Sequence, residues 1–416
     1  MKKHFGLTLL LLPLLVGCGG TSNSTTTPAG GKGTEPTVTD PFVLGTKRTD
    51  AELLEKAKAE TGTFKAYGNS SRIADAVKGF ITKYPELNLD PAKSTGSKRK
   101  DSEIYTKITS EYSAKDNSSG ASFVLIQDSA RLATYRKSPT KILTNYVSDT
   151  FKANLDEGDL VPLVDQYINK LFIWNNTGND VPNISNVWEL TEEKFKGKVY
   201  FKNPNSEMVN RNFLTRLTKE TWVAKRTRAY KDYFKKDYVA SKDYVTSAKY
   251  KNASYEWIGK FLSNADITSY TSDTTLAGGL SKEDNHGKMG LFVLSKLRDS
   301  SVTADNLTVG AWQDKAIAPF SGFGYALYAQ LTTKAPRPYT ARLFTNYRRT
   351  AEGFNPWGKS IGCYSSNHTI AKNSADKKDL AFYKQNLVRE DGEYINTVKV
   401  DTEDWINQLI DKKTGK

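Results

Sequence analysis

Residues 64–84 read FKAYGNSSRIADAVKGFITKY and place a short strand, a polar loop and an amphipathic helix in direct succession. Pro85 ends the expected helix, whose apolar face is formed by Ile73, Val77, Phe80, Ile81 and Tyr84. The same order of strand, loop and helix returns along the chain, which predicts an α/β fold with a mostly parallel sheet. Ligands bind such sheets beyond the carboxyl ends of the strands, so the loops that follow strands are candidate binding regions.

Further strands and helices are expected on both sides of this segment. The apolar run FVLI at 123–126 has the composition of a strand that is buried on both faces. Other strands are expected at 87–89, 171–174, 198–201, 290–294 and 323–330. Helices are expected at 51–60, at 101–114, from Val209, from Arg342, at 376–386 and at 402–412.

Length and composition restrict the class of protein. A chain of 416 residues is longer than one core usually needs, so two or more lobes are expected. Hydrophobic residues at 38% and charged residues at 25% are typical of a folded protein with a solvated surface. The net charge of +14 permits nucleic acid, anionic lipid or an anionic solute as neighbours. Two cysteines and three histidines argue against a disulfide scaffold and a His-built metal site.

The first eighteen residues, MKKHFGLTLLLLPLLVGC, have the pattern of an export signal. The apolar run that follows the two lysines is too short to span a hydrocarbon core of about 30 Å. Leu15-Val16-Gly17-Cys18 resembles the bacterial lipobox, which implies cleavage after residue 17 and lipidation of Cys18; an ordinary secretion signal is the alternative. Residues 18–46 are rich in Gly, Ser, Thr and Pro and predict a flexible tether.

Five blocks in the rest of the chain resemble, in their order, the bacterial extracellular solute-binding proteins of ABC importers, in the two-lobed class called type II. The blocks are YGNSSR at 67–72, NKLFIWNN at 169–176, WELTEEKFKGKV at 188–199, GLF at 290–292 and APRPYTARLF at 335–344. The third block is similar to the stretch that opens the second lobe in relatives that bind iron or polyamines.

The resemblance implies a type II periplasmic-binding-protein-like fold, with mixed sheets flanked by helices and hinge strands between two lobes. It divides the chain into a first lobe at 47–168, a second lobe at 169–322, and a return to the first lobe with closing helices at 323–416. It also implies a non-enzymatic monomer that is lipid-anchored on the outer face of the cell membrane, captures one small solute, and works with an ABC permease and ATPase. No cofactor is expected.

The candidate ligand-binding residues follow the expected strands. They are Asn69, Ser70, Ser71, Arg72, Asp128, Ser129, Asn205, Ser206, Ser295 and Lys296. Serines at helix starts lie beside free backbone N–H groups, where the helix dipole favours negative charge. Arg72, Lys296 and Arg298 add cations, so the pattern favours a small polar and anionic solute. The alternative for the serines and for Asp128 is that they only cap helices.

Other solutes and other functions stay open. Ferric-ion binders of this class carry two adjacent tyrosines where this chain has Ser295-Lys296, and a lysine repels a trivalent cation, so no metal site is predicted. A polyamine would need more acidic residues than Asp128 and Glu207. Residues 211–251 hold many more basic than acidic residues, interleaved with tyrosines, so a surface that binds polyanions or nucleic acid is an alternative to a solvated helical face. Without G-x-S-x-G or H-E-x-x-H, no catalytic residue is assigned.

Overall fold

The computed structural model describes residues 43–44, 48–242 and 250–415, and all of them belong to one unit, Val38–Lys416. The predicted signal peptide, Cys18 and residues 19–42 of the predicted tether lie outside the described residues. Val43–Leu44 form strand β1, which pairs in parallel with β5 (Leu143–Tyr146). These two residues at the end of the predicted tether thus pair with the first lobe.

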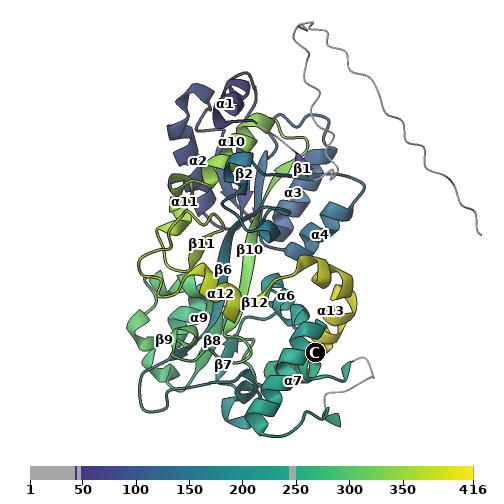
Figure 1. The fold of residues 1–416 in the computed structure, drawn as a ribbon, viewed down its shortest axis with the longest axis vertical. Helices are drawn as coiled ribbons and strands as arrows, with labels where there is room; N and C mark the ends of the chain where they lie inside the picture. Colours follow the sequence, from purple (N-terminus) through teal and green to yellow (C-terminus); the bar gives the residue numbers. More distant parts are fainter. Residues whose placement is uncertain (1–42, 45–47, 243–249, 416) are drawn as a thin grey trace, which may run out of the picture. The chain divides into compact units, whose positions relative to one another are not determined.

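The sheet of the first lobe has the strand order β3-β2-β4-β10-β5, and Figure 1 labels β2 and β10 of this sheet. Strands β3 (Thr95–Lys98), β2 (Lys65–Gly68) and β4 (Phe123–Ile126) are parallel to one another. The C-terminal end of β10 (Gly322–Thr332) runs antiparallel between β4 and β5. The first lobe therefore receives one of its strands from a segment almost two hundred residues further along the chain.

The second lobe repeats this arrangement with different strands. Strands β7 (Val199–Phe201) and β8 (Met289–Val293) are parallel. Strand β6 (Val164–Asn175) runs antiparallel between β8 and β9 (Leu307–Val309). Strand β6 thus has the same place in the second lobe as β10 has in the first.

Strands β6 and β10 cross from one lobe to the other and pair antiparallel, from Leu171 opposite Gly322 to Val164 opposite Tyr328. Two short strands extend this ribbon: β11 (Cys363–Ser365) pairs with β6, and β12 (Val388–Arg389) pairs with β10. These are the hinge strands that the sequence predicts. The sheet is mixed, as the predicted fold class has it. The prediction of a mostly parallel sheet from the repeated strand, loop and helix is wrong, because β10 runs antiparallel to β4 and β5, and β6 runs antiparallel to β8 and β9.

Helices cover both faces of the sheet. Those of the first half of the chain are α1 (Asp50–Lys58), α2 (Arg72–Lys83), α3 (Asp101–Ser113), α4 (Ser129–Lys137), α5 (Asp149–Lys152), α6 (Met208–Arg216) and α7 (Glu220–Phe234). The later ones are α8 (Ala253–Asn264), α9 (Asp273–Leu280), α10 (Pro338–Arg348), α11 (Ala351–Gly358), α12 (Leu380–Asn386) and α13 (Gly392–Thr414). No helix in the described part of the chain is long and apolar enough to cross a bilayer.

Helix α13 packs against both lobes. In the first lobe, Asn396 of this helix accepts a hydrogen bond from the hydroxyl of Thr134 in α4, at 2.8 Å. In the second lobe, Asn407 accepts one from Arg211 in α6, at 3.0 Å. Helix α13, drawn in yellow in Figure 1, therefore lies along one edge of the junction and contacts both lobes.

Most predicted elements are confirmed, and the exceptions have physical reasons. Strand 123–126 and the helices at 51–60 and 101–114 match β4, α1 and α3 to within two residues. The strand predicted at 87–89 is wrong, because Asn88 adopts a left-handed backbone with φ 48° and Pro85–Leu87 form a short 3-10 turn. The strand lies at Thr95–Lys98 instead, an edge strand without apolar side chains and therefore without a hydrophobic signal.

Candidate functional site

The candidate site lies where the loops after the parallel strands of the two lobes face each other across the hinge. Tyr328 pairs with Ile126, which places the carboxyl end of β4 at the middle of β10. Lys170 pairs with Val293, which places the carboxyl end of β8 at the middle of β6. Between these two points, Tyr325 pairs with Ile168, which also pairs with Cys363 of β11. The loops therefore meet over a floor formed by these three residues.

The loop after β2 brings Arg72 to this floor. Its Nη1 donates to Sγ of Cys363 at 3.4 Å and to the carbonyl oxygen of Trp357 at 3.5 Å. Asn69 donates to Gln127 of the neighbouring loop, at 2.5 Å. Ser70 accepts the backbone N–H of Arg72, whereas Ser71 is exposed and its side chain makes no capping bond to α2. Of the predicted residues in this loop, Arg72 is thus the one held nearest to the hinge.

The loop after β4 is fixed by two carboxylates. Asp128 caps α4 by accepting the N–H of Arg131 at 3.0 Å, which is the structural alternative considered for this residue. Asp101, the first residue of α3, accepts the N–H groups of Gln127 and Asp128 through Oδ2, at 2.8 and 2.7 Å. Burial, and then the charge of Asp128, raise the pKa of Asp101 to about 7. Ser129 is buried beside Glu390.

The loop after β7 leaves its predicted residues exposed. Asn205 and Ser206 are exposed, and Ser206 donates to the carbonyl of Asn203 at 3.0 Å, which closes a local turn. The next residue, Glu207, pairs with Lys202, and the charge of Lys170 also lowers its pKa against the effect of burial. Lys170 itself donates to Asn210 at 2.9 Å. In this loop the ionic groups, not the predicted polar ones, turn toward the hinge.

The turn after β8 carries Ser295, Lys296 and Arg298. Ser295 is buried, and its backbone nitrogen lies so close to Gly362 (φ +78°) that a Cβ there would come within 2.6 Å of it. Arg298 Nη1 donates to the carbonyl of Ser295 at 3.0 Å. Burial, and then the charge of Arg72, lower the pKa of Arg298, so the two guanidinium groups approach each other from opposite lobes.

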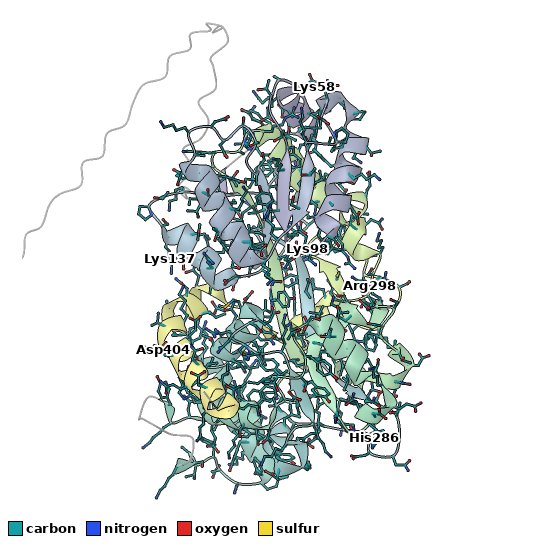
Figure 2. The ribbon with its side chains drawn as sticks, turned by 180° about the vertical axis from the view of Figure 1, so that it is seen from behind. Lys58, Lys98, Lys137, His286, Arg298 and Asp404 are labelled. Atoms are coloured by element: carbon teal, nitrogen blue, oxygen red, sulfur yellow. The ribbon has the colours of Figure 1, made fainter. Side chains whose placement is uncertain are left out.

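Four basic side chains, Arg72, Lys98, Lys296 and Arg298, form what we call the basic rim. Arg72 and Lys98 come from the first lobe, and Lys296 and Arg298 from the second. Figure 2 shows Lys98 beside the crossing strands and Arg298 on the second lobe. Burial, and in smaller part the charges of Arg298 and Lys98, hold the pKa of Lys296 below its usual value against the opposing charge of Asp273. None of the four forms an ion pair with another described residue.

Several residues of this site escape sequence reasoning. Lys170 and Tyr325 lie in the middle of strands, where a loop-based search does not look. Arg298, by contrast, is one of the cations that the sequence predicts for an anion, and the 3-10 helix Leu294–Arg298 folds it back. Asp101 opens a helix that is far in sequence from the loop it holds. Among the described residues, no group of three or more His, Cys, Asp or Glu side chains is arranged to hold a metal ion.

Solved structures share this architecture. An IdiA/FutA protein of Trichodesmium, solved with iron and citrate, is 15% identical, covers 84% of this chain and 99% of its own, and gives a TM-score of 0.59. Iron-bound HitA from Pseudomonas aeruginosa is 12% identical, with the same coverage and a TM-score of 0.60. The chain has the two-lobed fold of the periplasmic binding proteins. This fold is also found in an ABC transporter structure from Clostridium perfringens, at 11% identity, 84% and 99% coverage, and a TM-score of 0.55.

In this two-lobed fold, the loops of both lobes meet at the junction above Tyr325 and Ile168. The predicted fold class and the resemblance to extracellular solute-binding proteins are confirmed at the level of the fold. No family model matches the sequence, and no curated protein matches it either.

Proposed function

We propose that this chain is the solute-binding component of an ABC transporter, which captures a small polar solute between its lobes and delivers it to a permease and its ATPase. The observation that carries the proposal is the basic rim, which draws cations from both lobes to one place above the hinge strands. A solute that contacts Arg72 and Arg298 at once would join the lobes. The similar structures, which include iron-binding proteins and an ABC transporter, support the class.

An anionic solute fits this rim best. Like charges that approach from two lobes repel each other, and the repulsion opposes closure until a negative group lies between them. Among the described residues, the side-chain partners of Arg72 are neutral, a thiol and a carbonyl oxygen, so its charge is available to an anion. Arginine also offers paired N–H donors that match carboxylate or phosphate oxygens. We therefore propose a carboxylated or phosphorylated solute as the ligand in preference to other solutes.

A ferric-ion or polyamine receptor of the same class is the second candidate. The similar structures with bound iron favour it, as do the carboxylates of Asp101, Asp128 and Glu207 near the junction. Lys296 stands against it, because an ammonium group directly after β8 repels a multivalent cation.

A surface that binds polyanions or nucleic acid is the candidate from another class. Helix α7 exposes Lys225, Arg228 and Lys231. The described tyrosines of this stretch pack against the core of the second lobe, however, and Tyr230 lies edge-on to Trp188 with ring centroids 5.0 Å apart. We therefore interpret the stretch as the solvated outer face of a helical lobe.

Localisation and domain division are part of the proposal. We place the protein on the extracytoplasmic face of the cell membrane, held by a lipidated Cys18 after removal of residues 1–17, and acting as a monomer. We also keep the division into a first lobe at 47–168, a second lobe at 169–322 and a return at 323–416. We also propose that the protein has no enzymatic activity, because a solute-binding component captures and delivers its ligand without changing it.

Calorimetric titration tests the proposal. The purified chain without its first 17 residues is titrated with phosphate, citrate, a sugar phosphate, ferric citrate, spermidine and a neutral sugar. We expect saturable binding of one anion and a loss of at least tenfold in affinity in both Arg72→Gln and Arg298→Gln. The control is Arg228→Gln, whose side chain is 87% exposed on α7 and whose loss should change nothing. Binding of spermidine or bare ferric ion alone, or anion binding that neither rim variant weakens, would overturn the anion assignment.

A further inference from the structure

The floor under the basic rim is open to solvent at one residue of a hinge strand. Of the 12 residues of β6, Ile168 is the one that is not buried, although β6 is an inner strand of the sheet. An isoleucine that solvent reaches in the middle of an inner strand is an unusual position, because such strands are normally covered on both faces. Ile168 therefore marks the point at which the space between the lobes extends down to the hinge.

Two side chains flank Ile168 on the same face. Tyr325 of β10 pairs with Ile168 from one side, and Cys363 of β11 pairs with it from the other. Residues that lie directly opposite each other on neighbouring strands point their side chains to the same face of the sheet. Arg72 Nη1 donates to Cys363 Sγ at 3.4 Å, so the guanidinium group lies on this face as well. Tyr325 is thus placed beside Ile168 and under the basic rim.

The hydroxyl of Tyr325 has no hydrogen-bond partner among the described residues, although Tyr325 is only 5% exposed. The hydroxyl oxygen is also not one of the fully enclosed polar atoms of the hinge, such as Nδ2 of Asn169, so it remains accessible. A nearly buried donor that stays unpaired costs about 1–3 kcal/mol, and native proteins rarely leave one without a partner from the protein, water or a ligand. The hydroxyl is therefore a position at which a bound solute can make a hydrogen bond.

The groups around this hydroxyl indicate which solute atom it fits. Burial, and then the charges of Asp273 and Glu207, raise the pKa of Tyr325 well above its usual value, so the hydroxyl keeps its proton and is a donor. Asp273 lies 3.4 Å from the ammonium group of Lys170, and Glu207 pairs with Lys202, so neither carboxylate requires a cation from the solute. A charged oxygen at the hydroxyl would be repelled by the two carboxylates, whereas a neutral oxygen needs only the donor.

We propose that Tyr325 is a specificity-determining residue, whose hydroxyl donates to a neutral oxygen of the solute while Arg72 and Arg298 hold the anionic group. The inference rests on the proposed function and narrows its ligand to an organic oxyanion with a hydroxyl, ether or carbonyl oxygen, such as a hydroxycarboxylate or the phosphate ester of a polyol. The carbon atoms between the two groups lie over Ile168, which offers an apolar contact. An anion of the same size without the neutral oxygen leaves the Tyr325 hydroxyl unpaired.

Pairs of anions that differ only in hydroxyl groups test the inference. Calorimetric titration of the unaltered chain compares malate with succinate, citrate with tricarballylate, and glycerol 3-phosphate with propyl phosphate. We expect a pair whose hydroxylated member binds about tenfold more tightly or better, because its partner leaves a nearly buried donor unpaired. In Tyr325→Phe this preference should fall below about twofold, while the member without hydroxyl groups keeps its affinity.

Tyr328→Phe is the matched control. Tyr328 follows Tyr325 by three residues in β10 and lies on the opposite face of the sheet, where it lines a separate cavity with Gly324 and Ala326. Its hydroxyl also has no hydrogen-bond partner among the described residues. Tyr328→Phe should therefore keep the full preference for hydroxylated anions. Tyr325→Phe itself removes an unpaired hydroxyl, so its melting temperature without ligand should be no lower than that of the unaltered chain.

The outcomes separate this inference from the proposed function. If no anion of the panel binds to the unaltered chain, the anion assignment of the proposed function fails, and the inference fails with it. If anions bind without a preference for hydroxyl groups, or if Tyr325→Phe keeps the preference, the anion receptor stands and the inference about Tyr325 is overturned. A visible absorption band that forms with ferric ion and is lost in Tyr325→Phe would also overturn it, because the phenolate would then be a metal ligand.

Discussion

Arg72 and Cys363 are joined by a hydrogen bond of 3.4 Å from Nη1 to Sγ, although 291 residues separate them in the chain. The bond ties the start of α2 in the first lobe to β11, which is paired with the hinge strand β6. Burial raises the pKa of the Cys363 thiol more than the nearby charges of Arg72 and Arg298 lower it. The thiol therefore stays neutral and does not compensate the two arginines.

The first prediction concerns this uncompensated charge. In Arg298→Gln, removal of the cation relieves its repulsion with Arg72, so the unliganded protein should unfold at a melting temperature no lower than that of the unaltered chain. Addition of the anionic solute should stabilise the unaltered chain but not this variant. Thermal unfolding with and without the solute measures both effects. A clear loss of stability in the unliganded variant would contradict the repulsion.

The second prediction concerns the contact between Gly362 and Ser295. Gly362→Ala should destabilise the protein by about 2 kcal/mol or more, because it combines a left-handed backbone with a clash against Ser295 N. Gly197→Ala is the matched control, since Gly197 has a similar φ of +71° but nothing within 4 Å of its Cβ position. Urea unfolding of both variants separates the clash from the backbone strain. Equal losses in the two would show that the contact is unimportant.

The third prediction concerns a buried ion pair. Asp165 lies at the irregularity of β6 and pairs with Arg348 at 2.6 Å and with Arg349 at 3.3 Å, and all three side chains are almost completely buried. Asp165→Asn leaves two buried cations without a counter-charge, which should cost about 3–5 kcal/mol in unfolding free energy. Asp232→Asn, in the exposed pair with Arg228, should cost less than about 1 kcal/mol. Similar losses of unfolding free energy in Asp165→Asn and Asp232→Asn would contradict the role given to the buried ion pair.

The fourth prediction concerns pH. Burial raises the pKa of Glu390 to about 8 in the folded protein, well above its value in the unfolded chain. The folded state therefore binds the proton more tightly, and this contribution to stability is present at low pH and is lost as the pH rises toward and through about 8. Asp101, with a pKa raised to about 7, acts in the same direction. Unfolding measured from pH 5 to 9 should show a shallower fall in stability for Glu390→Gln than for the unaltered chain; parallel curves would contradict this.

Sequence patterns locate the fold better than they locate the site. The strand at 123–126 is predicted to the residue, because four buried apolar side chains in a row leave little choice of structure. The edge strand Thr95–Lys98 is missed, because half-exposed polar residues carry no such pattern. Among the site residues, Arg72, Lys296 and Arg298 follow from the rule that ligands bind after strands. Glu390 does not, because it follows a short late strand, Val388–Arg389, that the sequence pattern does not predict.

The exchange of strands between the lobes has a consequence for how the protein folds during synthesis. The first lobe lacks an internal strand until β10, which ends at Thr332, has emerged, and the segment 47–168 alone would leave the edge of β4 unpaired. Because this contact joins residues so distant in sequence, the chain cannot complete its N-terminal lobe early. A lobe that is completed late keeps a newly made chain incompletely folded for longer.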